Sequence, residues 1–242
     1  MNQSHFVSVI IPTYRDWDRL KLCLDALKLQ TFSTDQFEVL VVNNDPEDLP
    51  PYEVSIGNTR LLEEARPGSY AARNTAIRSA KGDILAFTDS DCIPDADWVQ
   101  NAVNQLMAGA QRIAGNIELF FRSEKLTVVE IYEKAFAFDQ KSTARSGASV
   151  TANMITWAKN FESVGLFNEK LMSGGDVEWG RRAQAAGIPI IYARKIIVRH
   201  PARLSLKEIM RKKRRLMGGL EKMSAKHSRT HVAELLLRGY LP

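Results

Sequence analysis

The first part of the chain alternates short apolar runs with helical patterns, and this alternation restricts the fold more than any other feature of the sequence. Four runs have the length and the β-branched content of strands: residues 6–11, 37–42, 59–63 and 83–88. Helical patterns lie between them, from about residue 16 and over residues 69–80. Strands and helices that alternate in this way predict a parallel α/β sheet with helices on both faces.

The second half of the chain is less regular. Strand patterns are found at residues 112–121, 152–157, 188–192 and 195–199, and helical patterns at residues 125–138, 158–164, 176–187 and from 205 onward. The polar stretch "DQKSTARSGAS" (139–149) predicts a flexible segment that could act as a lid. We expect one large domain, 1–203, with halves at 1–110 and 111–203, and a helical tail at 204–242.

Composition places the chain among ordinary globular proteins. Its 242 residues are 45% hydrophobic and 25% charged, which allows a substantial core. There is no apolar run of the roughly 18–20 residues that a membrane-spanning helix needs, and the N-terminus lacks the basic region and cleavage site of a secretory signal. Cys23 and Cys92 suggest neither a disulfide framework nor a zinc site. These features predict a cytoplasmic protein.

The stretch "FTDSDCIPDADW" (87–98) places four aspartates directly after an apolar strand pattern. Carboxylates held close together repel one another unless a cation lies between them. Either this loop is simply solvated, or Asp89 and Asp91 hold Mg²⁺ or Mn²⁺, which take carboxylate oxygens as ligands. Residues 12–15 and 43–45 also follow strand patterns, and ligands of open α/β sheets lie at such strand ends. We expect the three segments to converge.

Three further features are candidates for chemistry. The start of the helix at 69–80 would favour a diphosphate, with Arg66 and Arg73 nearby, unless these are ordinary exposed arginines. Asp176 follows two glycines in "SGGDVEWGRR" and is either a helix cap or a general base. His200 ends a strand pattern and is either a core-edge histidine or a metal ligand. The residues alone leave each alternative open.

In this order and spacing the segments resemble the family-2 glycosyltransferases, which are inverting, nucleotide-sugar-dependent enzymes. The resemblance covers about residues 6–200 and rests on "VSVIIPTYRDWDRLKLCLDALKLQTF", "FEVLVVNND", "RPGSYAARNTAI", "GDILAFTDSDCIPDADW" and "SGGDVEWGRRAQAAG" followed by "VRHP". It implies an α/β fold of the GT-A type (a Rossmann-like nucleotide-diphospho-sugar transferase) with a mixed central sheet flanked by helices and a C-terminal basic helical tail.

The resemblance implies a nucleobase pocket bordered by Pro12, Thr13 and Tyr14. Asn43 stands where the family usually has an aspartate that contacts the base. An amide can both donate and accept, so a UDP-sugar is the donor we expect first.

Around the donor diphosphate the resemblance implies a metal ion, Mn²⁺ or Mg²⁺. Its ligands would be Asp89, Asp91 and His200. Arg73 and Asp89 would also lie near the nucleotide, and Asp176 matches the position of the catalytic base. This base would deprotonate an acceptor hydroxyl in a single inverting displacement.

The activity implied is transfer of one sugar to a saccharide or lipid-linked acceptor, in polysaccharide or glycolipid synthesis. The processive members carry a Gln-x-x-Arg-Trp signature, whereas the comparable region here is "RKKRRLMGG", which indicates single-sugar transfer. Two other readings stay open: a degenerate glycosyltransferase that acts as a binding or scaffold protein, and a sugar nucleotidyltransferase. The second lacks support because "IIPTYRDWD" contains no glycine-rich, basic loop.

The net charge of +5 is concentrated in the tail. Residues 201–242 hold 11 Lys and Arg against 3 Asp and Glu, whereas the preceding 200 residues carry a net −3. Residues 204–231 form a cationic amphipathic stretch that either packs on the domain or lies on an anionic membrane surface, at the inner face of the cell membrane. Homodimerisation through this helix also stays open. The cluster has no stacking aromatic residue, so we expect no nucleic-acid partner.

Overall fold

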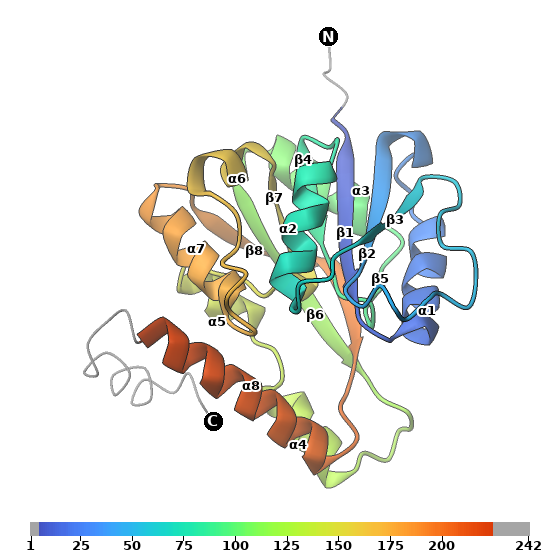
Figure 1. Cartoon of the computed structure of the whole chain (residues 1–242). Coiled ribbons are helices and arrows are strands. Elements are labelled where there is room, and N and C mark those ends of the chain that lie inside the picture. The colour runs from blue at the N-terminus through green and yellow to red at the C-terminus, as the bar shows by residue number, and fades with distance from the viewer. Residues whose placement is uncertain (1–4, 225–242) are drawn as a thin grey trace.

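The computed structural model describes residues 5–224, which form one eight-stranded sheet flanked by helices (Figure 1). The strand order is β3-β2-β1-β4-β7-β6-β8-β5. The strands are β1 Val7–Thr13, β2 Phe37–Asn43, β3 Thr59–Glu63, β4 Ile84–Phe87, β5 Ile93–Pro94, β6 Arg112–Phe120, β7 Met154–Trp157 and β8 Ile190–Pro201. The α-helices are α1 Trp17–Lys28, α2 Ser69–Ser79, α3 Trp98–Met107, α4 Val128–Phe136, α5 Gln140–Arg145, α6 Lys159–Val164, α7 Gly175–Ala185 and α8 Leu206–Ser224.

The first half has the predicted parallel arrangement. Strand β1 pairs in parallel with β2 and β4, and β2 pairs in parallel with β3. Every residue of β1, β2 and β4 is buried, as expected for parallel strands covered on both faces. The carboxyl ends of these strands point towards the side of the molecule on which α4 and α8 lie (Figure 1).

The second half makes the sheet mixed, which confirms the predicted central sheet. Strand β7 is antiparallel to both β4 and β6, whereas β6 and β8 are parallel. The expectation of two short strands at 188–192 and 195–199 is wrong. Pairing with β6 runs from Ile190 to Pro201 and only shifts register between Gly115 and Asn116, so β8 is one long strand.

Two helices were not predicted. Helix α3 packs against the sheet through the buried Trp98, whose indole N–H donates to Asn153 Oδ1 at 2.9 Å. Helix α5 lies within the stretch 139–149 that was expected to be flexible. The Asp139 carboxylate accepts from the Ser142 N–H at 2.9 Å, and the buried Gln140 exchanges hydrogen bonds with the Val150 backbone. These contacts order the segment.

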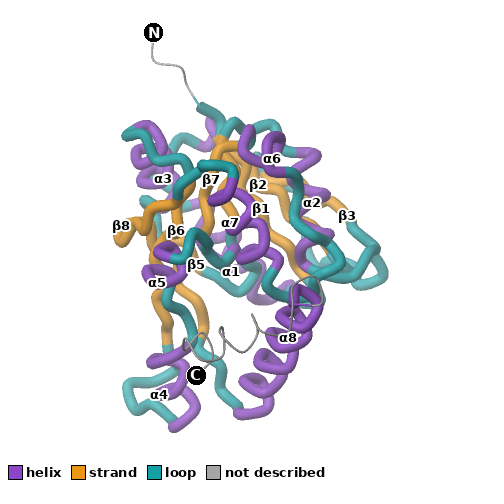
Figure 2. Tube along the Cα trace, turned by 90° about the vertical axis from the view of Figure 1, so that its left-hand side faces the viewer, coloured by secondary structure: helices purple, strands orange, loops and turns teal. Residues whose placement is uncertain are grey.

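The sheet lies between two layers of helices (Figure 2), and the core has one part on each side of it. Helices α1 and α3 cover one face, where Leu20 and Trp98 are completely buried. Helices α2, α6 and α7 cover the other, where Phe161 stacks on Trp179 at 4.3 Å between ring centroids. Alternate residues of a strand face opposite sides, so one strand supplies both parts. The core thereby fixes α2 and α7 against the strands whose ends form the site.

The basic helix α8 packs on the rest of the protein. Before it, Arg203 donates at 2.8 Å to Glu133 of α4, and within it Lys212 donates at 3.2 Å to the Ala137 carbonyl. A Cβ on Gly219 would collide with the Ser173 carbonyl, so the α8 backbone abuts the loop that leads to α7. Between residues 5 and 224, no helix is both long and apolar enough to cross a bilayer.

The apolar residues of α8 differ in their exposure. Ile209 is buried, whereas Leu206, Met210 and Met217 are exposed. The part of the predicted basic stretch beyond residue 224 lies outside the described residues.

Candidate active site

Three loops meet at the carboxyl ends of β1, β2 and β4, as predicted. The Asn44 N–H donates to the Thr13 carbonyl at 2.8 Å, which joins the loops after β1 and β2. Arg15 donates to Asp45 at 2.6 Å across the same gap. From α1, Arg19 reaches the third loop, with its guanidinium 3.5 Å from the Asp91 carboxylate. The polar segments that the sequence placed at strand ends therefore lie together.

Asp89 is paired with a buried cation. Its carboxylate accepts from the guanidinium of Arg73 in α2, and Arg73 is only 3% exposed. The Arg73 guanidinium also lies over the Tyr70 ring, 5.6 Å from the centroid. An uncompensated buried charge is costly, so Arg73 and Asp89 stabilise each other.

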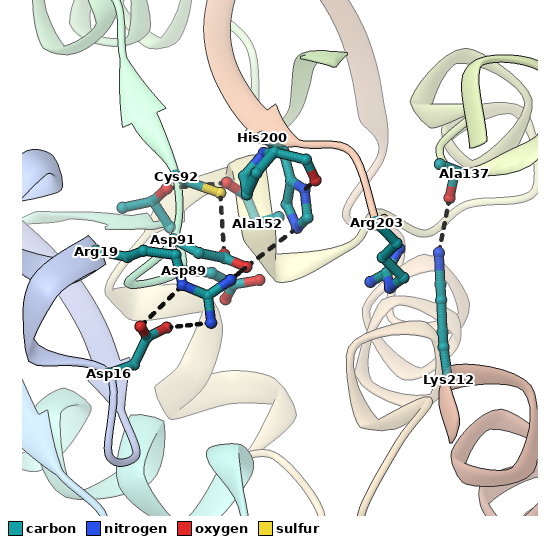
Figure 3. A network of polar contacts seen from close by, with 12 residues as sticks. Asp16, Arg19, Asp89, Asp91, Cys92, Ala137, Ala152, His200, Arg203 and Lys212 are labelled. Atoms are coloured by element: carbon teal, nitrogen blue, oxygen red, sulfur yellow. Dashed lines mark hydrogen bonds and ion pairs between the residues drawn. The ribbon is translucent and has the colours of Figure 1, made fainter. Parts of the chain in front are cut away.

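Asp91 faces His200 at the end of β8 (Figure 3). The distance from Asp91 Oδ2 to His200 Nε2 is 3.6 Å, too long for a hydrogen bond. His200 Nδ1 lies 2.7 Å from the Pro201 carbonyl, and a carbonyl only accepts, so Nδ1 carries a proton. This leaves Nε2 as the nitrogen directed at the carboxylate. A carboxylate oxygen and an imidazole nitrogen thus face one another at the carboxyl end of β4.

Cys92 is a neighbour that sequence reasoning did not include. Asp91, Cys92 and His200 can each present one ligand atom within 4.8 Å of the others. The thiol is buried, and burial together with the nearby carboxylates raises the pKa of Cys92 well above its ordinary value. A protonated thiol is a poor metal ligand. Of the three groups, the carboxylate and the imidazole are therefore better candidate ligands than the thiol.

Arg66 is held by two carboxylates. Its guanidinium donates to Glu64 at 2.6 and 2.9 Å and to Glu169 at 2.8 Å. These hydrogen bonds from Arg66 lower the pKa of Glu64 to about 2. Nearby, the Asn44 side chain accepts from the Gly68 N–H at 2.9 Å and fixes the start of α2. The predicted contact of Arg66 with a diphosphate stays a prediction.

The residues predicted to border the nucleobase differ in exposure. Pro12 and Thr13 are buried, whereas Tyr14 is 59% exposed. Asn43 is also buried: its amide donates to the Asp48 carbonyl at 3.0 Å, and its carbonyl oxygen accepts from the Asp45 N–H at 3.1 Å. Asn43 thus shapes the loop after β2, and its role towards a base stays a prediction.

Asp176 lies at the second residue of α7 and is only 8% exposed. Its Oδ1 accepts from the Tyr70 hydroxyl at 3.0 Å and from the Val177 N–H at 2.9 Å. Its Oδ2 accepts from the Thr151 N–H at 3.2 Å. Thr88, directly after β4, donates to the Ala152 carbonyl at 3.1 Å. This hydrogen bond joins the segment of Thr151 and Ala152 to the loop of Asp89 and Asp91.

Sequence reasoning missed Tyr70, Arg19 and Thr151. Tyr70 is 106 residues away from Asp176 in sequence, and Arg19 is 72 residues away from Asp91. The segment "RPGSYAARN" was noted for its helix start and its arginines, and a buried tyrosine inside it has no local pattern that distinguishes it from a core residue. Only the tertiary arrangement of α1, α2 and α7 around the strand ends reveals the contacts.

The mixed sheet with its buried parallel strands, flanked by helices, has the architecture of the GT-A fold. The model of the family described as "Glycosyl transferase family 2" matches residues 8–155, more than half of the chain. This protein belongs to glycosyltransferase family 2 and is a glycosyltransferase.

Curated relatives are glycosyltransferases. "Glycosyltransferase AglE" of Haloferax volcanii is 34% identical over 98% of this chain and 82% of its own length. "UDP-Glc:alpha-D-GlcNAc-diphosphoundecaprenol beta-1,3-glucosyltransferase WfgD" of Escherichia coli is 28% identical over 57% of this chain and 53% of its own length. Several other relatives are longer, and the chain aligns with less than a third of "Uncharacterized glycosyltransferase YibD" of E. coli, at 27%.

Solved structures show the same fold. The mannosyltransferase PcManGT from Pyrobaculum calidifontis, in complex with GDP-Man and Mn²⁺, superposes with a TM-score of 0.70 at 21% identity, over 88% of this chain and 61% of that one. TarS residues 1–349 of S. aureus, in complex with UDP-GlcNAc, superposes with a TM-score of 0.62 at 17% identity, over 83% of this chain and 59% of that one. Both neighbours bind nucleotide-sugars.

Proposed function

We propose that this chain is a metal-dependent, inverting glycosyltransferase that moves one sugar from a nucleotide-sugar to a hydroxyl acceptor. A UDP-sugar is the donor that we propose to test first. The observation that carries the proposal is the position of Asp176, whose carboxylate accepts from Thr151, while the next residue, Ala152, accepts from Thr88 at the start of the loop that holds Asp89 and Asp91. A base and an acidic loop at one strand edge are the parts that an inverting sugar transfer needs. We assign residues 1–110 to the donor and 111–203 to the acceptor.

The donor half supplies the pocket and the charge for the nucleotide. Residues 12–14 and Asn43 would border the base, and Arg66, Arg73 and the start of α2 would lie towards the diphosphate. Neighbours of the same fold bind GDP-Man in one case and UDP-GlcNAc in another, so the fold alone does not select the nucleotide. The amide of Asn43 in place of a carboxylate is the feature of this chain that bears on that selection.

The residues present fit a Mn²⁺ or Mg²⁺ ion. Asp91 Oδ2 and His200 Nε2 lie 3.6 Å apart, and Asp89 is in the same loop. A carboxylate with an imidazole suits Mn²⁺, and carboxylates with phosphate oxygens also suit Mg²⁺. The Pro201 carbonyl orients the imidazole, as an outer partner usually does for a ligating histidine. When bound, the ion would neutralise charge on the leaving diphosphate.

The protein's own part in the reaction centres on Asp176. Its carboxylate would take the proton of the acceptor hydroxyl as that oxygen attacks the anomeric carbon opposite the leaving nucleotide. One displacement inverts the configuration and needs no covalent intermediate. Arg73 would hold Asp89 in place and supply positive charge on the donor side. The nearby loop at 171–174, against which α8 packs, would shape the acceptor entrance.

We further propose that α8 lies on an anionic membrane surface, beside a lipid-linked acceptor. Its exposed apolar residues Leu206 and Met210 are four residues apart and therefore neighbours on the helix surface, and Met217 lies seven further on. Exposed Lys207 and Arg211 follow the same spacing. An apolar stripe beside a basic one is typical of an interfacial helix. Dimerisation through α8 is the alternative, and the vesicle experiment below distinguishes it from membrane binding.

The first experiment titrates UDP, GDP and CDP into the protein by calorimetry, with and without Mn²⁺. We expect metal-dependent binding of one nucleotide, lost in Asp91→Ala and retained in the control Asp97→Ala, which removes an exposed carboxylate from the same loop. No binding of any nucleotide in either condition would contradict the proposal and favour a scaffold protein.

The second experiment sediments the protein with phosphatidylglycerol or phosphatidylcholine vesicles. We expect binding to the anionic vesicles only, and loss of binding on double charge reversal at Arg211 and Arg214. The matched control reverses two exposed charges at the opposite edge of the sheet, Arg78 and Lys81. Equal binding by both double variants, or a dimer in solution without vesicle binding, would contradict the membrane proposal.

A further inference from the structure

Helix α2 contacts both acidic parts of the site through residues one turn apart. Tyr70 donates to Asp176, and Arg73 pairs with Asp89. Residues at i and i+3 of a helix lie on the same face, so these two contacts are made by one rigid surface. The Arg73 guanidinium lies over the Tyr70 ring, which links the two side chains directly.

The Tyr70 hydroxyl is the donor in its contact with Asp176. Burial, together with the charge of Asp176, raises the pKa of Tyr70 far above its ordinary value, so the phenol keeps its proton. A protonated phenol beside a carboxylate donates its hydrogen. Both side chains are buried, Tyr70 to 5% and Asp176 to 8% exposure, and hydrogen bonds to charged groups are stronger in such surroundings.

The hydrogen bonds distinguish the two oxygens of Asp176. Each carboxylate oxygen has two lone pairs. Oδ1 accepts from Tyr70 and from the Val177 N–H, so both of its lone pairs are used. Oδ2 accepts from the Thr151 N–H alone within residues 5–224, so it keeps a lone pair for another hydrogen.

The Tyr70 ring packs closely against the backbone of Gly175, the residue before Asp176. A Cβ on Gly175 would lie 2.8 to 3.0 Å from three atoms of the Tyr70 ring, closer than carbon atoms pack. The ring therefore occupies the space next to the backbone that carries Asp176. Phe167 holds the ring from another side, at 5.6 Å between centroids.

We propose that Tyr70 is a positioning residue for Asp176: by binding Oδ1, it directs Oδ2 towards the acceptor hydroxyl and fixes the base relative to the Arg73–Asp89 pair. The inference rests on the proposed role of Asp176 as the base. No proton leaves Tyr70 in the reaction. Its contribution is to keep one carboxylate rotamer, and misplacing a catalytic group by about 1 Å can cost roughly 10²-fold in rate.

The test is Tyr70→Phe, which removes only the hydroxyl and keeps the ring between Gly175 and Arg73. Release of UDP or GDP from UDP-glucose, UDP-GlcNAc and GDP-mannose is measured with Mn²⁺ and with water as the acceptor. We expect kcat to fall about 10- to 100-fold while the donor KM and the nucleotide Kd stay within about twofold. A residue with only a structural role would not separate kcat from KM in this way.

Tyr192→Phe is the matched control. Tyr192 also donates one side-chain hydrogen bond, to Asn116 at 2.9 Å, but it lies near the opposite end of β8 from His200. We expect its kcat to stay within about twofold of the parent protein. A Tyr70→Phe variant that behaves like Tyr192→Phe, while Asp176→Asn is inactive, would overturn the inference and leave the proposed function intact. An active Asp176→Asn would instead overturn the proposed function.

A double-mutant cycle tests the contact without turnover. The unfolding midpoints of Tyr70→Phe, Asp176→Asn and the double variant are compared with the parent protein. We expect the double variant to lose less than the sum of the two single losses, because either substitution already weakens the same hydrogen bond. Additive losses would overturn the inference even if none of the three donors is turned over.

Discussion

The loop after β4 and the start of α7 both bring carboxylates to one edge of the sheet, but they hold them in different ways. Asp89 pairs with Arg73, and Asp91 faces Arg19 and His200. Asp176 accepts hydrogen bonds from three uncharged donors, with no ion pair among the residues that the structure covers. Cations compensate the first pair, whereas neutral donors orient Asp176 and leave its charge uncompensated. This difference suits a cation site in one case and a base in the other.

The largest effect should come from Asp176→Asn. Loss of a general base costs about 10²- to 10⁴-fold, so we expect kcat to fall by that factor. Nucleotide affinity should not change, because the substitution leaves Asp89 and Asp91 in place. Turnover and calorimetry on the same preparation check this. If nucleotide affinity falls as well, the two acidic centres are not independent and the comparison fails.

The second effect separates the two aspartates of the loop. Asp91→Asn should weaken Mn²⁺ binding at least about tenfold, because an amide replaces the charged oxygen that faces His200. Asp89→Asn should weaken it less, since Arg73 already occupies that carboxylate. Paramagnetic titration of Mn²⁺ without nucleotide measures both. Equal losses in the two variants would show that Asp89 leaves Arg73 to bind the ion.

In a stability measurement the order of the two variants should be reversed: Asp89→Asn should lower the free energy of unfolding more than Asp91→Asn does. Asp89→Asn leaves the buried Arg73 without its counter-charge, so we expect a loss of about 1–3 kcal/mol, reduced from the cost of a fully buried pair because Asp89 is partly exposed. Asp91→Asn should cost less than about 1 kcal/mol, since its partner Arg19 is about half exposed. Urea unfolding at neutral pH compares them. A larger loss for Asp91→Asn would contradict the pairing described above.

The smallest effect concerns another cation-held carboxylate, Glu64. Hydrogen bonds from Arg66 lower its pKa to about 2, below the ordinary 4.5, so the folded state favours the charged form. The stabilisation is present above about pH 4.5 and is lost as the pH falls towards 2. The stability difference between the parent protein and Arg66→Gln, which is small because the arginine is exposed, should shrink over that interval. Unfolding curves from pH 7 to pH 3 check this, and a difference that grows on acidification would contradict it.

Local patterns in the sequence predicted one half of the fold better than the other. The strands at 37–43 and 59–63 and the helix α2 match their predicted places closely, because parallel strands between helices give a strong periodic signal. Residues 139–149 and 188–199 were misjudged because α5 is ordered by Gln140 and Asp139 contacts and β8 is continued by its pairing with β6. A distant strand decided the length of β8, whereas α5 depends on these side-chain contacts with residues no more than 10 positions away.

By itself, the sequence determined that residues 12–15, 43–45 and 89–91 follow strands and meet, because chain order in an α/β sheet brings strand ends to one edge, and it located Asp176 at the start of a helix. Only the tertiary structure decided which group holds each carboxylate. Arg73 could serve Asp89 or solvent, and nothing local connects Tyr70 with a residue 106 positions away. These choices depend on how α2 packs on β1, β2 and β3, since hydrogen bonds and ion pairs form only where the packed core places two groups within reach.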